Sequence, residues 1–119
     1  EHGQAMRADD NRFGHKVWQI LSDYQDRNQT VKDAGIKPTI SDGMGDGWLR
    51  LMRFDMSGPE PRVKVETYST HYHKQSRDTA DYPAWYKAQE HPALSDADFH
   101  AQDDFSFELT GFNERFGRQ

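Results

Sequence analysis

The feature that most constrains the fold is a pair of strand-like segments joined by a short turn. In "RVKVETYST" (62–70), Val63 and Val65 point to one side of an extended chain and the charged residues between them to the other. The segment before it, "GWLRLMRFD" (47–55), is also strand-like, and "SGPEP" (57–61) supplies glycine and proline for a turn. Because a connection this short joins only antiparallel neighbours, the pattern predicts a β-hairpin with one buried face.

Two further strands and two short helices are predicted on either side of this hairpin. The segment "KVWQILSDYQ" (16–25) carries apolar side chains on both faces, as in a strand that is covered on two sides. Near the end of the chain, "DDFSFELTGF" places Phe105 and Phe107 on one face of a last strand. In the segment between the hairpin and this last strand, prolines near both ends predict a helix over 83–90. Ser95 is suited to cap a second helical turn.

Three stretches lack the periodicity of strands. Residues 1–15 are polar and punctuated by glycine, and 26–46 contain a proline and a glycine cluster, so both are predicted to be loops. Residues 71–102 hold the two predicted helices and otherwise form loop. The expected fold is mainly β (α+β), an antiparallel sheet of about four strands with one or two short helices before the last strand. The whole of 1–119 is expected to be a single domain or a fragment of one.

Composition predicts a folded chain with a thin core. Hydrophobic residues make up only 34% of the 119 residues and the mean hydropathy is −1.09, yet the 13% of aromatic residues lie mostly within patterned segments. The net charge of −5 gives no sign of the basic surface that nucleic-acid binding requires. No apolar run approaches the roughly 20 residues of a membrane span, and the lack of cysteine excludes disulfides and thiolate metal sites.

Three patterns resemble functional motifs, but each has a simpler structural interpretation. His71 and His73 would share one side of an extended segment, yet a zinc or copper site needs further ligands that the sequence does not place. The stretch "DGMGDG" (42–47) lacks the alternating oxygen ligands and closing glutamate of a calcium loop, which favours a turn. An acidic group is interpreted as a solvated surface that also caps helices: Asp96, Asp98, Asp103 and Asp104.

The order of the strand-like segments carries more information than any of these motifs. The succession "VWQILSDYQ", "GDGWLRLMRFD", "VKVETYS" and "DDFSFEL" resembles the C-terminal part of calcineurin-like metallophosphoesterases, in particular a bacterial branch with DYQ, GWLR and TYS strands. The resemblance covers most of the chain and keeps the approximate spacing. It implies that these strands complete one sheet of the αββα sandwich of an intact enzyme.

The resemblance also implies a metal ligand near residue 1. The last metal-binding motif of the family is Gly-His-x-His, shortly before the DYQ strand, and Glu1-His2 falls where its x-His would lie. His2 would then be a metal ligand in the intact enzyme only. There, two divalent ions (Mn, Fe or Zn) would activate a hydroxide that attacks a phosphomonoester or phosphodiester. The other metal-binding segments of the family are absent, so no catalytic residue is expected here, and the isolated chain is expected to be inactive and to bind no metal tightly.

The partner implied by the resemblance is a missing N-terminal catalytic half. Apolar surface that this half would cover predicts self-association of the chain at high concentration. The loops 26–46 and 71–102 are longer than a minimal family member needs and would shape substrate entry, and the family branch implies export to the periplasm. The alternative is an autonomous, non-catalytic β domain that binds a partner through its tryptophan and tyrosine residues, which explains the lack of catalytic groups directly.

Overall fold

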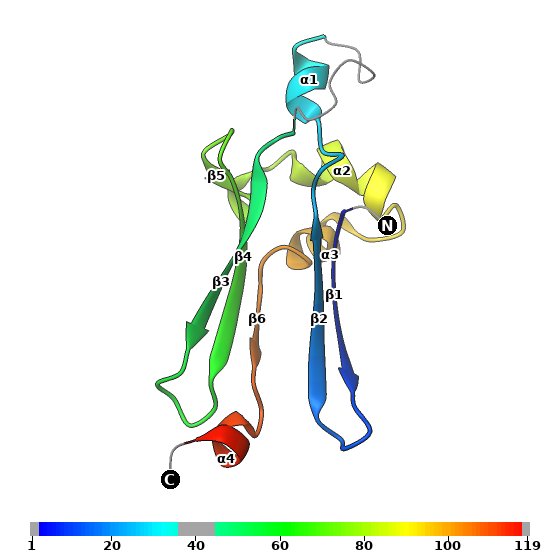
Figure 1. Cartoon of the computed structure of the whole chain (residues 1–119). Coiled ribbons are helices and arrows are strands. Elements are labelled where there is room, and N and C mark those ends of the chain that lie inside the picture. Colours follow the sequence, from blue (N-terminus) through cyan, green and yellow to red (C-terminus); the bar gives the residue numbers. More distant parts are fainter. Residues whose placement is uncertain (1–2, 36–44, 118–119) are drawn as a thin grey trace.

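The computed structural model describes residues 3–35 and 45–117, which form an elongated body of 59 × 28 × 25 Å (Figure 1). Its radius of gyration is 17.1 Å, where a compact chain of this length would have roughly 13–14 Å. The elements in chain order are β1 (Gly3–Asp10), β2 (Lys16–Asp23), α1 (Gln29–Asp33), β3 (Trp48–Asp55), β4 (Arg62–Ser69), β5 (Lys74–Gln75), the 3₁₀ turn η2 (Ser76–Asp78), α2 (Tyr82–Glu90), α3 (Asp96–Ala101), β6 (Phe105–Glu108) and α4 (Phe112–Phe116).

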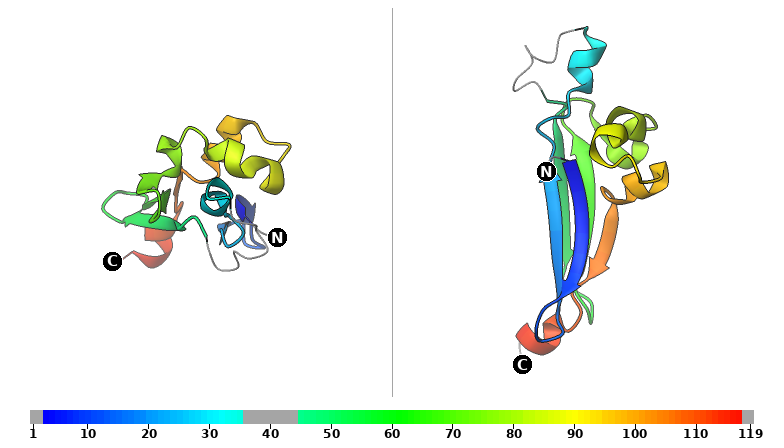
Figure 2. Two further views of the ribbon diagram at one scale, coloured as in Figure 1. Left: turned by 90° about the horizontal axis from the view of Figure 1, so that it is seen from above. Right: turned by 90° about the vertical axis from the view of Figure 1, so that its right-hand side faces the viewer.

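Two antiparallel sheets form the body of the molecule. Strands β1 and β2 make a hairpin in which Gly3 lies opposite Asp23 and Asp10 opposite Lys16. In the second sheet β4 is central, with β3 along one edge and both β5 and β6 along the other. Seen from the side, the hairpin forms a layer in front of the larger sheet (Figure 2). The predicted class, mainly β with antiparallel strands and a few short helices, is confirmed.

The predicted elements lie close to their expected positions. Strands β2, β3, β4 and β6 form where the apolar patterns indicate, and the β3–β4 pair is an antiparallel hairpin. Val63 and Val65 are fully buried, as the alternation in β4 requires. Helices α2 and α3 also form, and the Ser95 hydroxyl caps α3 by accepting a hydrogen bond from the Asp98 N–H at 3.1 Å.

The prediction of a loop over residues 1–15 is wrong, because this segment contains β1. The strand lacks a regular alternation of apolar and polar residues, and its conformation comes from contacts that are distant in sequence. It pairs with β2 along its whole length. The Gln4 side chain donates to the Phe99 carbonyl at 3.2 Å, and the Met6 N–H donates to the Gln102 side chain at 2.9 Å. The extended conformation of β1 is therefore determined by the residues that it contacts rather than by its own composition.

Other differences concern short elements and the number of sheets. The strands form two sheets instead of one, with β1–β2 separate from β3–β4–β6. The segment 26–46 contains α1 in its described part, and α4 follows β6 where no helix was expected. Helices of five residues each leave little periodicity to detect in a sequence.

Apolar side chains gather in two small clusters. The aromatic core consists of buried Trp48, Tyr82, Tyr86 and Phe99, and lies where α2 and α3 meet the sheet. The sheet core consists of Val63, Val65 and Phe107, against which Trp18 and Ile20 from β2 pack together with Phe105 and Leu109. The rings of Trp18 and Phe107 stack with centroids 4.0 Å apart, which joins the two sheets.

Strand β3 remains largely uncovered along its length. Leu51 is 48% exposed, Met52 is 42% exposed and Phe54 is 57% exposed, although all three lie in the middle or second half of the strand. No strand in the described part of the chain pairs with the outer edge of β3. An apolar strand of eight residues with a free edge is a surface that natural proteins usually cover.

Candidate functional site

Of the histidines singled out in the sequence, the structure describes His71 and His73, and neither belongs to a group of potential metal ligands in the described part of the chain. His2 lies outside the described residues. His71 and His73 lie in the turn between β4 and β5 rather than in an extended segment, and His73 has a φ of 54°. The His71 ring packs edge-on against Tyr72 with centroids 4.8 Å apart. Within residues 3–35 and 45–117, no three His, Asp or Glu side chains come close enough to share a metal ion.

Asp103, which was expected on a solvated surface, is completely buried. One of its carboxylate oxygens accepts hydrogen bonds from the Tyr24 hydroxyl and from Arg50, each at 2.8 Å. The other oxygen accepts from the Tyr82 hydroxyl at 2.8 Å, and the Thr67 hydroxyl donates to the Asp103 backbone carbonyl at 3.0 Å. A buried carboxylate is stable only when it is paired and hydrogen-bonded in this way, so the earlier interpretation is corrected.

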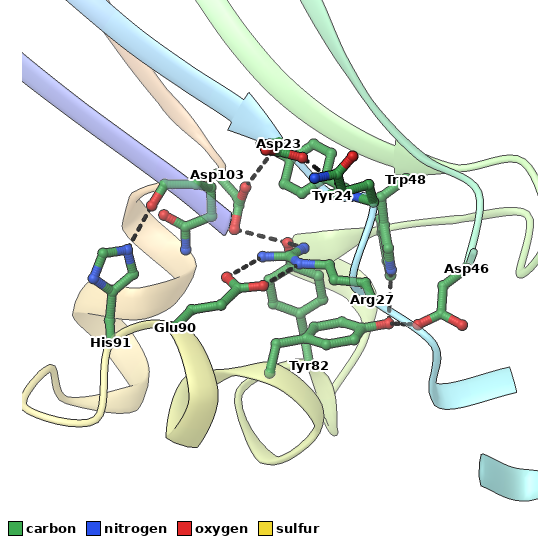
Figure 3. A network of polar contacts seen from close by, with 12 residues as sticks. Asp23, Tyr24, Arg27, Asp46, Trp48, Tyr82, Glu90, His91 and Asp103 are labelled. Atoms are coloured by element: carbon green, nitrogen blue, oxygen red, sulfur yellow. Dashed lines mark hydrogen bonds and ion pairs between the residues drawn. The ribbon is translucent and has the colours of Figure 1, made fainter. Parts of the chain in front are cut away.

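A second buried ion pair adjoins this network (Figure 3). Arg27 is 2% exposed and binds both carboxylate oxygens of Glu90, each at 2.7 Å. Its remaining nitrogen donates to the Tyr82 hydroxyl. The guanidinium also lies over the rings of Tyr24 and Tyr86, in each case 4.4 Å from the centroid. Arg27 thereby connects the end of α2 to the segment that follows β2.

Asp46 anchors a third part of the same region. It is 1% exposed and belongs to "DGMGDG", of which residues 42–44 lie outside the described part of the chain. Its carboxylate accepts hydrogen bonds from the backbone N–H groups of Gln29 and Thr30, each at 2.8 Å, at the start of α1. It also accepts from the Tyr86 hydroxyl at 2.5 Å, and this hydroxyl accepts from the Trp48 indole at 2.8 Å. Asp46 thus holds α1 against α2 and β3.

Burial raises the pKa values of the tyrosines in this region. The pKa of Tyr24 rises to about 12, chiefly because the hydroxyl is desolvated and because Asp103 disfavours a second negative charge. The pKa values of Tyr82 and Tyr86 rise for the same main reason. Burial alone lowers the pKa of Arg27, but hydrogen bonding to Glu90 and the charge of Asp103 outweigh it and raise the value. The three tyrosines therefore stay neutral and Arg27 stays charged at ordinary pH.

This arrangement can hold strands together but offers little for catalysis. Its carboxylates and hydroxyls are already engaged with one another, so they would have to break buried hydrogen bonds to reach a substrate. We name the group formed by Tyr24, Arg50, Thr67, Tyr82 and Asp103 the Asp103 network. It joins the segment after β2, the strands β3 and β4, the helix α2 and the segment before β6.

Sequence reasoning missed Asp46 and Asp103, although a signal for both was present. Trp48 and Arg50 of β3 face inward. Asp46 lies two positions before Trp48, so in an extended chain it faces the same side. In the same way, Phe107 and Phe105 lead back to Asp103. Extending the alternation beyond each strand end would have placed both carboxylates inside the molecule.

Comparison of the chain with protein-family models, with curated proteins and with solved structures finds no match. None of the helices in the described part of the chain has the length and apolar character needed to cross a membrane.

Proposed function

We propose that the chain is the C-terminal part of a calcineurin-like metallophosphoesterase, an enzyme that hydrolyses phosphomonoesters or phosphodiesters with two divalent ions. The observation that carries the proposal is the convergence of separate sequence motifs on one carboxylate. The DYQ segment supplies Tyr24, GWLR supplies Arg50 and TYS supplies Thr67. All three bind Asp103, from the DDFSFEL segment.

Convergence of this kind supports the resemblance because the motifs lie far apart in the chain. Chance matches over four stretches would have no reason to bring their polar residues to a single buried site. A shared task in the fold gives such a reason, since a buried carboxylate requires every one of its partners. On this proposal the recurrent motif residues are structural and hold together the strands that complete one sheet of the enzyme.

On this proposal the chain completes one sheet of the enzyme and does not by itself contain the whole catalytic centre. The residues that the structure describes do not fit a dinuclear metal site by themselves, and no reaction step is assigned to them. His2 is the proposed metal ligand of this part of the enzyme, and the remaining ligands belong to an N-terminal half. Strand β3 supports a larger assembly, because its apolar residues Leu51, Met52 and Phe54 lack cover in the described structure.

A second candidate function follows from the same exposed strand. An autonomous β domain that binds another protein would also present an uncovered apolar edge and would need no metal ligands. The two candidates differ in the sequence that the gene encodes before Glu1. The phosphoesterase proposal requires Gly-His immediately upstream, preceded by Asp-x-His, Gly-Asp-x-x-Asp and Gly-Asn-His segments.

Sequencing the coding DNA upstream of the Glu1 codon therefore tests the proposal directly. Gly-His and the earlier motifs are the expected result, and a start codon or a signal-cleavage site at this position would contradict it. Hydrolysis of bis(p-nitrophenyl) phosphate with Mn²⁺ gives a second test. We expect activity from the chain extended by the upstream motifs and none from residues 1–119 alone, and equal activity of the two would contradict the assignment of ligands to the upstream half.

A further inference from the structure

Strand β3 has a free edge that is regular along its whole length. It pairs with β4 from Trp48 to Asp55 without a bulge, and its other edge forms an outer side of the molecule (Figure 1). None of the described strands pairs with that edge. The strand also contains no proline and no lysine, which are residues that commonly keep an edge strand from pairing with another chain. The backbone of β3 is therefore able to accept a further strand.

The backbone groups that point to this edge follow from the pairing with β4. The Gly47 carbonyl accepts a hydrogen bond from the Thr70 N–H at 2.9 Å, so Gly47 directs its backbone groups toward β4. Successive residues of an antiparallel strand direct their N–H and C=O groups to opposite sides. The odd-numbered residues of β3 therefore face β4, whereas Met52 and Phe54 direct their backbone groups to the free edge.

The side chains of Met52 and Phe54 continue the apolar face of the sheet beyond its cover. Met52 lies directly opposite Val65 and Phe54 opposite Val63, so the four side chains share one face. Side chains of β2 pack on the two valines, which are fully buried. Met52 and Phe54 remain 42% and 57% exposed. The apolar face thus extends one strand further than the β1–β2 hairpin that covers it.

The other face of β3 carries an arginine that lacks an acidic partner. Arg53 forms no hydrogen bond or ion pair with any residue that the structure describes, and it lies directly opposite Lys64. Like charges in this position are destabilising. Asp55 is exposed on the same face, and its Oδ1 accepts from the Ser57 N–H at 3.0 Å and from the Ser57 hydroxyl at 2.6 Å. Its Oδ2 accepts no hydrogen bond from the described residues, so this oxygen is available to a cation of another chain.

A second copy of the chain matches these charges in one particular register. Two antiparallel copies of β3, related by a twofold axis perpendicular to the sheet, place residues of the same face opposite each other. An axis at Arg53 or at Asp55 would set like charges opposite each other. An axis at Met52 would set Arg53 opposite Leu51. With the axis at Phe54, Arg53 of each copy lies opposite Asp55 of the other.

We propose that β3 pairs with β3 of a second copy about a twofold axis at Phe54. The two Phe54 residues exchange N–H···O=C hydrogen bonds in both directions, because their backbone groups point outward. An ion pair between Arg53 and Asp55 flanks them on either side. On the apolar face, Met52 lies opposite Met56, which is 48% exposed in the single chain, so the uncovered side chains cover one another. The inference goes beyond the proposed function and does not depend on it.

Complementary charge variants test this register. In Arg53→Asp a carboxylate at position 53 faces Asp55 of the copy, and in Asp55→Arg a guanidinium at position 55 faces Arg53. Each variant alone should dimerise at least about tenfold more weakly than the wild-type chain. In an equimolar mixture, one copy of each variant brings opposite charges together at both positions, so association should return to the wild-type level. Sedimentation velocity over a range of concentrations measures it.

The matched control is the pair Glu114→Arg and Arg115→Asp. Both residues are exposed on α4, and the two substitutions change the net charge as the first pair does. We expect wild-type association from each control variant and from their mixture. A control mixture that gains as much association as the mixture of Arg53→Asp and Asp55→Arg would overturn the proposal, since net charge would then explain the effect.

Amide hydrogen exchange locates the contact on the strand edge. The Met52 and Phe54 amides should become protected as the concentration rises, whereas the Arg53 amide, which faces β4, should be protected at every concentration. A chain that stays monomeric, or a variant mixture no tighter than its separate components, would overturn the proposal. Monomers of a chain extended by its upstream sequence, with both amides protected, would also overturn it, because a segment of the same chain would then cover the edge.

Discussion

The two ends of the molecule are stabilised by different kinds of interaction. At the helical end, shown at the top of Figure 1, α2 and α3 pack on the sheet through buried aromatic rings and the Asp103 network. At the hairpin end, below it, the sheets meet through the small sheet core around Phe107. Hydrogen-bonded charges demand one geometry, whereas apolar contacts tolerate several. The comparison indicates that the contacts at the helical end determine how the strands are arranged, and that the strands keep this arrangement as they continue toward the hairpin end.

The largest effect is expected at the centre of the helical end. Asp103→Asn leaves the buried Arg50 without its counter-charge, and we expect a loss of about 3–5 kcal/mol in the free energy of unfolding. Urea unfolding followed by circular dichroism measures it. Asp104→Asn is the matched control, because the neighbouring carboxylate pairs with partly exposed Arg77 at 3.4 Å and should cost less than about 1 kcal/mol. Similar losses for both variants would refute the special role of Asp103.

A somewhat smaller effect is expected in the sheet core. Phe107→Ala removes the ring that stacks on Trp18, and a loss of about 3 kcal/mol follows from the cavity and the lost burial. The control is Phe116→Ala, since Phe116 is 64% exposed on α4. Urea unfolding of both variants gives the comparison. A loss for Phe107→Ala larger than that for Asp103→Asn would reverse the ranking of the two ends.

Alkaline pH should act on the helical end. The pKa of Tyr24 is about 10 in the unfolded chain and about 12 in the folded one, so the fold favours the neutral form. The corresponding stabilisation is fully present below pH 10 and is lost as the pH rises through 12, at a cost of about 2–3 kcal/mol. Urea midpoints measured from pH 8 to pH 12 should fall above pH 10, and Tyr24→Phe should fall less steeply. A flat profile would contradict the burial of this hydroxyl.

Substitutions at two glycines with similar φ angles distinguish the cost of backbone strain from the cost of a close contact. Gly47 precedes β3 with a φ of +71°, and a Cβ there would lie 2.6 Å from the Thr70 hydroxyl and 2.9 Å from the His71 nitrogen. Gly14, in the turn of the hairpin, has a φ of +77° and open space around it. Gly14→Ala should cost about 1–2 kcal/mol through strain alone, and Gly47→Ala more. Thermal unfolding of the pair tests this, and equal losses would show that the contact at Gly47 relaxes.

The smallest change in stability is expected on β3. Leu51→Lys replaces a side chain that is 48% exposed, so the free energy of unfolding should change by less than about 0.5 kcal/mol. Self-association should nevertheless weaken, because a lysine on a free strand edge opposes pairing. Light scattering over a range of concentrations measures it, with Val17→Lys on the other sheet as the control. A wild-type chain that is monomeric at every concentration would remove the basis of this prediction.

The sequence was sufficient to predict the elements with a strong local pattern. Val63 and Val65 identify β4, and Ser95 marks the start of α3, because period-two alternation and helix capping are local properties. Strand β1 could not be predicted in this way, since its conformation depends on β2 and on contacts to Phe99 and Gln102.

The candidate site shows the same limit more clearly. An aspartate such as Asp103 is usually exposed, and only the arrival of Arg50, Tyr24 and Tyr82 from distant segments makes its burial stable. The pair of Arg27 and Glu90 likewise combines the segment after β2 with the end of α2. Such groupings are properties of the tertiary structure, and a sequence alone indicates them only through alternation that continues past a strand end.

The three tryptophans are divided between the two ends of the molecule, so their fluorescence can report on each end. Trp18 stacks on Phe107 at the hairpin end, whereas Trp48 and Trp85 lie in or against the aromatic core of the helical end. The indole of Trp48 donates to a tyrosine hydroxyl that in turn binds a carboxylate, so its emission will be sensitive to the opening of that contact. Variants that retain a single tryptophan would report separately, by fluorescence, on the order in which the two ends come apart.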